Sequence, residues 1–426
     1  KAIRRQRQMC IRDSLYPDKR CFMSEKQKLY IDIFAGCGGL SIGLLKSGWT
    51  GLFAVEKNAD AFSTLEHNLI KKKKHFLWPD WLEVKEHDIN ELIKDHEEDL
   101  IALQGKITLV AGGPPCQGFS MAGKRDKNDQ RNKLVKSYIK FIKLVMPEAI
   151  IFENVHGFTV NFKDKKGTKK YSSYVERALK RLGYKTYHQI VDMSEYSVPQ
   201  KRKRFILVAM KNHSPKDVFS LLENNRRKFC NTHGITNKTT VYEAISDLEK
   251  GCGTCPSPDT KGFKAGIYGV AQSGYQKLMR QGMGGLNEPV DSHRFVNHRK
   301  DTISLHEDLL KYAPIGKRIT PNDNIVEGLN RRGVTVLDKN SQAPTITSIP
   351  DELVHYCEPR ILTVREHARI QSFPDWYEFK GKYTSGGARR KKEVPRYTQV
   401  GNAVPPLFAE QIGIALMEVL KDEPKE

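Results

Sequence analysis

A cysteine lies in a rigid segment rich in glycine and proline, GGPPCQGFS at residues 112–120. The segment follows the apolar run ITLVA, which is typical of a buried strand. Pro114 and Pro115 restrict the backbone before Cys116, and the flanking glycines leave room around it. A lone cysteine is usually a small buried apolar side chain, whereas a thiolate at a strand end beside basic residues can act as a nucleophile. The rigid turn favours the second interpretation.

A second glycine-rich segment, DIFAGCGG at residues 32–39, is typical of a cofactor turn between a strand and a helix. Glu56 ends the next apolar run, 20 residues after Gly36, where nucleotide-type folds hold ribose hydroxyls. Asp88 ends a third, weaker run and could accept a hydrogen bond from an adenine amine. The turn alone could equally serve packing, but three such features in chain order favour a nucleotide-like ligand.

An acid and two arginines follow later strands. Glu153 lies in FENV, where an apolar run ends, and Gln200, Arg202 and Arg204 alternate within PQKRKR. Alternating side chains share one face if the segment is extended. Taken singly, the first pattern could be a solvated strand end and the second a basic edge strand that resists aggregation.

The elements that must position these residues alternate along the chain. The sequence predicts strands at residues 29–36, 51–58, 83–89, 107–113, 149–155, 184–191 and 204–210, and helices at 40–48, 59–69, 134–146 and 172–183. Such alternation indicates an α/β fold, a Rossmann-like and mostly parallel sheet with helices on both faces. Its chemistry would lie at the carboxyl ends of the strands.

Four segments follow from changes in pattern. Residues 1–22 have no period and are expected to be disordered or non-native, and residues 23–212 form the catalytic domain. Residues 213–395 hold many Gly, Pro, Asn and Thr and form a smaller, loop-rich domain containing one helix, VYEAISDLEK. Residues 396–426 end in an apolar helix that needs a sheet to lie on, so we expect it to return to the catalytic domain.

Composition points to a polyanionic partner. Of 426 residues, 71 are Lys or Arg and 50 are Asp or Glu, a net charge of +21. Nucleic acid is the simplest partner for such a chain, although a generally basic surface is the alternative. Candidate phosphate contacts are the basic clusters at 71–74, 165–170, 226–228 and 389–392. No apolar run is long enough for a membrane span, and eight cysteines do not make a disulfide scaffold, so we expect an intracellular protein.

Together these motifs resemble those of the DNA cytosine-5 methyltransferases of bacterial or phage restriction–modification systems, over about residues 29–415. RILTVREHARIQSFPD at 360–375 and YTQVGNAVPP at 397–406 resemble the last two motifs of that family. Six or more motifs in the family's order make chance agreement very improbable. One small departure is His87, which stands before Asp88 where the family usually has glycine.

The resemblance implies S-adenosyl-L-methionine (AdoMet) as cofactor and cytosine carbon 5 as methyl acceptor. It implies a covalent adduct of Cys116 with ring carbon 6, Glu153 at ring nitrogen 3 and Arg202 at the base oxygen. Arg204 and Gln200 would contact the surrounding protein, and residues 121–134 would close over a flipped-out base. The implied cofactor residues are Phe34, Ala35, Gly36, Gly38, Gly39, Leu40, Glu56, Lys57, Asp88, Ile89, Pro114, Asn402, Ala403 and Val404.

The resemblance also implies double-stranded DNA as partner, read by residues 213–395. We expect a cytoplasmic, nucleoid-associated monomer with a possible cognate restriction endonuclease. Two alternatives stay open: a tRNA cytosine-5 methyltransferase of the same fold and a DNA-binding module without catalysis. The spacing of Cys230, His233, Cys252 and Cys255 approximates a zinc ribbon, but a helix falls in the gap and we expect reduced thiols and no metal.

Overall fold

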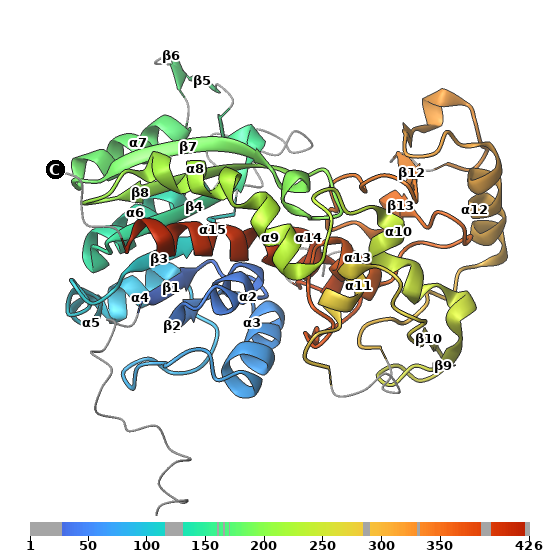
Figure 1. The fold of residues 1–426 in the computed structure, drawn as a ribbon, viewed down its shortest axis with the longest axis horizontal. Helices are drawn as coiled ribbons and strands as arrows, with labels where there is room; N and C mark the ends of the chain where they lie inside the picture. The colour runs from blue at the N-terminus through green and yellow to red at the C-terminus, as the bar shows by residue number, and fades with distance from the viewer. Residues whose placement is uncertain are drawn as a thin grey trace, which may run out of the picture.

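A six-stranded sheet forms the centre of the computed structural model, which describes residues 28–115, 131–159, 162–164, 167–169, 171–283, 290–329, 333–384 and 393–421 (Figure 1). The strand order is β2 (Thr50–Val55), β1 (Leu29–Ile33), β3 (Leu109–Gly112), β4 (Ala149–Val155), β8 (Lys203–Met210) and β7 (Lys185–Asp192). The first four strands are parallel, and β8 is antiparallel to both of its neighbours. The predicted α/β class is confirmed, and the sheet is mixed.

Helices cover both faces of this sheet. One face carries α2 (Gly39–Lys46), α8 (Pro215–Asn224) and α15 (Pro406–Val419); the other carries α4 (Ile89–Asp95), α5 (Glu97–Ile101), α6 (Arg131–Val145) and α7 (Tyr171–Arg181). Alternation along β1 separates the two cores, because Tyr30 packs into the first and Ile31 and Ile33 pack into the second. Because α8 lies on β7 and β8, the elements that cover the sheet extend past residue 212.

The strand predicted at residues 83–89 is absent. Glu83, Val84, Lys85 and Glu86 are exposed, because this polar stretch has no apolar face to bury in the sheet. Asp88 is instead the N-cap of α4, and its carboxylate accepts a hydrogen bond from the Asn90 backbone N–H at 2.7 Å. One backbone hydrogen bond, from His87 N–H to the Glu56 carbonyl at 2.8 Å, still holds the segment beside the end of β2.

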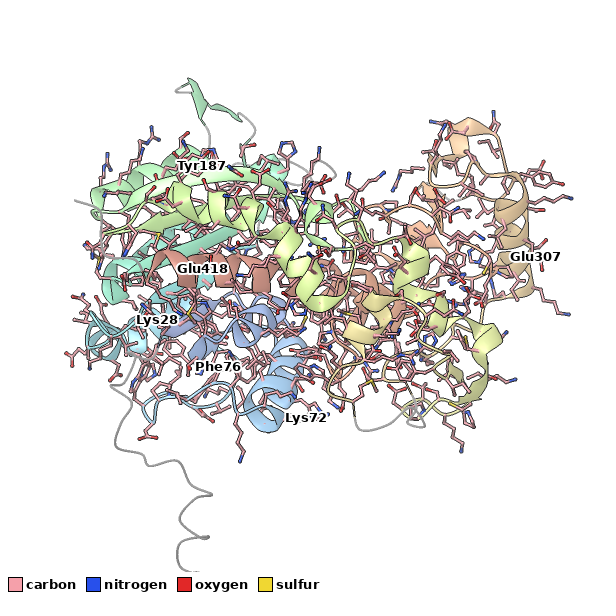
Figure 2. The ribbon with its side chains drawn as sticks, in the orientation of Figure 1. Lys28, Lys72, Phe76, Tyr187, Glu307 and Glu418 are labelled. Atoms are coloured by element: carbon pink, nitrogen blue, oxygen red, sulfur yellow. The ribbon has the colours of Figure 1, made fainter. Side chains whose placement is uncertain are left out.

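The second part of the molecule is an assembly of short elements (Figure 1). Its helices are α9 (Arg226–His233), α10 (Val241–Ile245), α11 (Gly274–Met279), α12 (Lys300–Tyr312), α13 (Val364–Ile370) and α14 (Arg396–Asn402). Its strands are β9 (Thr254–Pro256), β10 (Lys264–Gly266), β11 (Arg318–Ile319), β12 (Val334–Val336) and β13 (Leu353–Val354). Glu307 on α12 and Lys28 before β1 mark opposite ends of the molecule (Figure 2).

Further short elements connect these layers. The helix α3 (Ala59–Leu65) continues into a π-helix, η2 (Glu66–Lys72), and β5 (Phe162–Asp164) pairs with β6 (Gly167–Lys169). The 3₁₀ turns are η3 (His156–Thr159), η4 (Met193–Tyr196), η5 (Ser246–Leu248), η6 (Lys250–Cys252), η7 (Pro321–Asp323) and η8 (Pro350–Glu352).

Buried ion pairs hold α13 inside the second part. The Arg369 guanidinium contacts Asp375 at 2.6 Å and Asp247 at 3.1 Å, and all three side chains are fully buried. Arg360 contacts Glu366 at 2.7 Å, and the Glu366 carboxylate also accepts from the Thr363 N–H within a capping box. Removing one partner would leave a buried charge uncompensated, so breaking either pair should destabilise this part of the molecule.

The last helix, α15, packs against α2 near the start of the chain. The indole N–H of Trp49, which follows α2, donates to the Gly413 carbonyl of α15 at 3.1 Å. A Cβ at Gly43 would lie 2.3 Å from the Cβ of Ala409, so the two helices approach as closely as glycine allows. Residues 405–419 are mostly apolar and need a surface to pack against, and α2 supplies part of that surface. Within the described ranges, none of the helices has the length and apolar character needed to span a membrane.

Candidate active site

The predicted site residues lie at one edge of the sheet. The carboxyl ends of the parallel strands β1, β3 and β4 share this edge, and the antiparallel β8 begins there. The turn after β1 carries Gly36, the turn after β3 carries Gly113, and the ends of β4 and β8 carry Glu153 and Arg204. The arrangement follows from the strand directions and is the usual location of sites in open α/β sheets.

The cofactor turn is tied to Glu56. One carboxylate oxygen accepts from the Gly36 N–H at 2.9 Å and the other from the Asn58 N–H at 2.8 Å. Burial raises the pKa of Glu56, although these backbone hydrogen bonds lower it. An ionised carboxylate has about four acceptor positions, so Glu56 keeps capacity for further donors. Gly36 has a φ of +57°, and apart from its chain neighbours no described residue has an atom within 4 Å of where its Cβ would lie, so a ligand can approach the backbone there.

A second acid lies near Glu56. The Lys57 ammonium donates to Asp88 at 2.7 Å. Partial burial of Asp88 opposes ionisation, but the hydrogen bonds from Lys57 and Asn90 prevail and lower the pKa of Asp88. Asp88 therefore lies where sequence reasoning expected an acid, at the start of a helix and not at the end of a strand. Ile89, the first residue of α4, is buried beside it.

The last motif packs against the first. A Cβ at Gly39 would lie 2.4 Å from the Val404 carbonyl oxygen, so the turn after α14 touches the first residue of α2. Asn402 is exposed, and Ala403 and Val404 are half-buried. Ala35, Gly38 and Leu40 are buried around the turn, whereas Phe34 is half-buried with a φ of +61°. These residues, predicted from distant parts of the sequence, therefore meet around one turn.

An ion pair defines the other half of the site. The Nε of Arg204 lies 3.0 Å from a carboxylate oxygen of Glu153, and 13% and 16% of their side-chain surfaces are exposed. Val155 pairs with Arg204 in the sheet, so Glu153, two residues earlier, shares a face with the arginine. Burial raises the pKa of Glu153, and the charges of Arg204 and Arg202 oppose that rise. Burial also lowers the pKa of the Arg204 guanidinium.

The turn before the predicted nucleophile, at Gly113, packs closely against Glu153 of this ion pair. A Cβ at Gly113 would lie 2.7 Å from a carboxylate oxygen of Glu153, so only glycine fits there without displacement. The Asn154 side chain donates to the Pro114 carbonyl at 3.2 Å. Sequence reasoning missed Asn154, although its position beside the acid in FENV was a signal. Cys116 and residues 121–130 of the predicted closing loop lie outside the described residues, and residues 131–134 belong to α6.

The roles expected of the two arginines require correction. The Arg202 guanidinium, which is 2% exposed, donates to the carbonyls of Ile346, Gly401 and Ala403 at 3.1, 3.0 and 3.2 Å. Both terminal nitrogens of Arg202 are thus committed to backbone carbonyls and not to a base oxygen, whereas Arg204 lies at Glu153. Gln200 makes the expected protein contacts, because its amide donates to the Ile370 carbonyl at 3.2 Å and accepts from the Ile346 N–H at 3.1 Å.

Three of the cysteines in the described residues lack the lowered pKa that is typical of a nucleophile. The Cys37 thiol is buried and donates to the Gln399 carbonyl at 3.5 Å, and burial raises its pKa. Burial also raises the pKa of Cys252, and that of Cys357 to about 11. The four residues with zinc-ribbon spacing all lie in the described part of the chain, where no three His, Cys, Asp or Glu side chains converge on a metal position.

The basic clusters are partly committed to protein contacts. Lys72 pairs with Glu378, and the Lys73 ammonium lies 4.5 Å from the centre of the Trp376 ring. In the cluster at 226–228, Arg226 contacts Glu223 at 2.9 Å. Residues 389–392 lie outside the described residues, as does part of the cluster at 165–170. All four lysines of the run at 71–74 are exposed, and two of them, Lys72 and Lys73, contact the second part of the molecule.

A cavity of about 300 Å³ lies away from this chemistry. Its lining includes Lys28, Thr108, Glu148 and Lys211, which precede β1, β3 and β4 or follow β8. These positions mark the amino-terminal edge of the parallel strands, opposite the predicted site. Lys28 marks that end of the molecule in Figure 2. The cavity is therefore not part of the candidate active site.

Comparison with known proteins agrees with the geometry. Residues 29–418 match the family model described as C-5 cytosine-specific DNA methylase. The chain is 29% identical over 402 residues to the type II methyltransferase M.DdeI of Desulfomicrobium norvegicum, covering 90% of this chain and 86% of that protein. It is 30% identical over 394 residues to M.Sau96I of Staphylococcus aureus, covering 91% of this chain and 75% of that protein.

A solved structure shares the fold. A prophage-encoded E. coli protein assigned as a DNA modification methyltransferase superposes with a TM-score of 0.62 at 23% identity, over 93% of this chain and 100% of that one. The fold and the site thus define a methyltransferase built on a mixed α/β sheet. The chain belongs to the C-5 cytosine-specific DNA methylase family and is a DNA (cytosine-5-)-methyltransferase. Enzymes of this family use AdoMet as methyl donor and act on DNA.

Proposed function

We propose that this methyltransferase modifies one cytosine within a specific double-stranded DNA sequence, as the modification enzyme of a type II restriction–modification system. The proposal is supported by relatives that bear type II methyltransferase names and match about nine-tenths of this chain. We further propose that it acts in the cytoplasm as a monomer, with a cognate endonuclease. The net charge of +21 favours association with DNA there.

AdoMet would bind at the Gly36 turn. The residues present fit it, because Glu56 keeps free acceptor capacity for ribose hydroxyls and the space beside Gly36 is open. Asp88 and Ile89 would hold the adenine, Phe34 would lie against the adenine or ribose, and Asn402 to Val404 would flank the methionine end. When bound, AdoMet supplies an electrophilic methyl group for cytosine carbon 5.

Carbon 5 of cytosine is too weak a nucleophile to accept that group directly. The thiolate of Cys116 would add to ring carbon 6, which breaks aromaticity and makes carbon 5 an enamine carbon. Glu153 would present a proton at ring nitrogen 3 as electrons move into the ring, and Arg204 would neutralise charge at the base oxygen. The observation that carries this assignment is the buried Glu153–Arg204 pair, 3.0 Å apart, beside the turn that leads to Cys116.

The adduct must then collapse to release the product. A base removes the carbon 5 proton, the bond between Cys116 and carbon 6 breaks, and the thiolate leaves. The target must first leave the duplex, since stacking covers both ring faces. Residues 121–130, which precede α6, would close over the extruded base, and residues 213–395 would read the surrounding sequence.

Transfer of a labelled methyl group tests the substrate. Purified protein is incubated with methyl-labelled AdoMet and either duplex DNA or tRNA, with Glu153→Gln as the inactive control. We expect label in duplex DNA only, and bisulfite sequencing of that DNA should locate it at one sequence. Label in tRNA alone would replace the proposal with the tRNA enzyme, and DNA binding without label would indicate a binding module.

A segment exchange tests which part of the chain recognises the DNA sequence. Residues 213–358 are replaced by the corresponding segment of a relative such as M.DdeI. The methylated sequence should change to that of the donor, because the proposed catalytic groups lie outside the exchanged segment. An unchanged methylated sequence in an active chimera would place recognition elsewhere in the chain.

A further inference from the structure

Two buried side chains hold the backbone on either side of Asn402. A terminal nitrogen of Arg202 donates to the Gly401 carbonyl at 3.0 Å and the Ala403 carbonyl at 3.2 Å. The Gln371 amide donates to the Ala403 carbonyl at 2.6 Å and to the Val400 carbonyl at 3.1 Å. These carbonyls lie at the carboxyl end of α14, where a helix leaves its last acceptors without partners. The shape of this turn is therefore set by side chains from other elements.

Arg202 and the two residues before it also connect the turn to other segments of the second part. The other terminal nitrogen of Arg202 donates to the Ile346 carbonyl at 3.1 Å, and Gln200 bonds to both Ile346 and Gln371. The backbone N–H of Lys201 also donates to the Ala343 carbonyl at 2.8 Å. One short segment before β8 thus ties the turn after α14 to residues 343–346 and to the end of α13.

This segment also leads directly to the base-binding half of the site. Arg204, two residues after Arg202, contacts Glu153. On its opposite side, the turn after α14 touches Gly39 at the start of α2. Residues 401–404 are therefore held between the cofactor turn and Arg202, and the two arginines serve different halves of one site.

We propose that Arg202 is a positioning residue that sets the affinity for AdoMet by holding the carbonyls on either side of Asn402. The inference rests on the proposed placement of AdoMet beside Asn402 and Val404. A guanidinium suits this role because its planar, forked donors reach three carbonyls at once, whereas a lysine ammonium is a compact group on a flexible stem. Arg204, by contrast, serves the cytosine.

Two separate readouts distinguish the two halves. Calorimetry measures the affinity for AdoMet directly. Release of tritium from carbon 5 of cytosine in DNA, without AdoMet, measures addition to the base. After Cys116 adds to carbon 6, carbon 5 takes a proton from water; it then loses the tritium as a triton when the thiolate leaves, so the base is otherwise unchanged and no methyl group is needed.

The matched variants are Arg202→Lys and Arg204→Lys, which make the same chemical change two residues apart. For Arg202→Lys we expect the dissociation constant for AdoMet to rise about tenfold or more, with tritium release within about twofold of the wild type. For Arg204→Lys we expect the reverse, a large loss of tritium release with AdoMet affinity nearly unchanged. Unchanged AdoMet affinity in Arg202→Lys, or a loss of tritium release equal to that of Arg204→Lys, would overturn the positioning role.

A third variant keeps the test decisive if Arg202→Lys does not fold. Gln371→Met removes the other donors to this turn and leaves Arg202 in place, so it should also weaken AdoMet binding. If Arg202→Lys does not fold, an unchanged AdoMet affinity in folded Gln371→Met overturns the inference. Because calorimetry needs no catalysis, it decides the role of Arg202 even if the wild type releases no tritium. That failure would contradict the proposed function and not the positioning role.

Discussion

Removing the positive charge beside Glu153 should change the pH dependence of methyl transfer in a defined direction. In the structure, burial raises the pKa of this carboxyl, and Arg204 opposes the rise from 3.0 Å away. Arg204→Met keeps an apolar stem of similar length and removes the larger of the two charges that oppose the effect of burial on Glu153. The pKa of Glu153 should therefore rise further in the variant.

The size of the change follows from the distance. Two unit charges about 3 Å apart interact by roughly 5 kcal/mol at an effective dielectric constant of about 20. Both side chains keep some contact with solvent and Arg202 remains nearby, so only part of that energy should be observed. We expect a rise of about 1–3 pKa units, or about 1.4–4 kcal/mol.

The assay is the rate of methyl transfer in single turnover, measured across pH with saturating AdoMet and DNA. If Glu153 gives its proton to the base, activity falls as the carboxyl ionises, so the alkaline limb of the profile should move to higher pH in Arg204→Met. Arg204→Lys, which keeps the charge, should lower the rate with a much smaller shift. An alkaline limb at the same pH in the wild type and Arg204→Met would refute the assignment of that limb to Glu153.

Three further changes test other parts of the site and fold. Glu56→Ala should weaken AdoMet binding by about 1–3 kcal/mol in calorimetry, because a carboxylate that accepts ligand hydroxyls is lost; unchanged affinity would contradict this placement. Gly113→Ala should reduce methyl transfer by at least about tenfold, because its Cβ would lie 2.7 Å from the Glu153 carboxylate, whereas Gly251→Ala, with open space around it, should be neutral. Burial lowers the pKa of His355 from 6.5 to about 3, so the unfolded state takes up the proton first and stability is lost as pH falls below about 6.5. The fall in unfolding free energy between pH 7 and pH 5, measured with urea, should be smaller by about 2 kcal/mol in His355→Gln; an equal fall would show that this histidine does not contribute.

Much of the sheet was predictable because its strands are short apolar runs between turn residues. The runs at β1, β3 and β4 are mostly apolar, so the predicted strands form there. The strand predicted at residues 83–89 does not form, because only Val84 and Ile89 are apolar and the polar residues between them leave no apolar face to bury in a sheet. Asp88 lies at the N-cap of α4, where it pairs with Lys57, and its role at the adenine stays a prediction.

The partners of charged side chains were less predictable. Alternation in PQKRKR predicted that the arginines share one face, but it carried no information on which guanidinium would meet Glu153. That choice depends on the register of β8 against β4 and on carbonyls of residues 346, 401 and 403, which are far away in the sequence. The buried pairs of Arg369 with Asp247 and Asp375 were missed for the same reason.

The central claim, that Cys116 forms a covalent bond with the target cytosine, is tested most directly by trapping. DNA with 5-fluorocytosine at the methylated position should yield a stable adduct, because the fluorine on carbon 5 cannot leave as a proton. Peptide mass spectrometry should place the adduct on Cys116, and Cys357→Ala, which alters an exposed thiol in the second part, should form it normally. An adduct on another residue, or one that still forms in Cys116→Ala, would contradict the account.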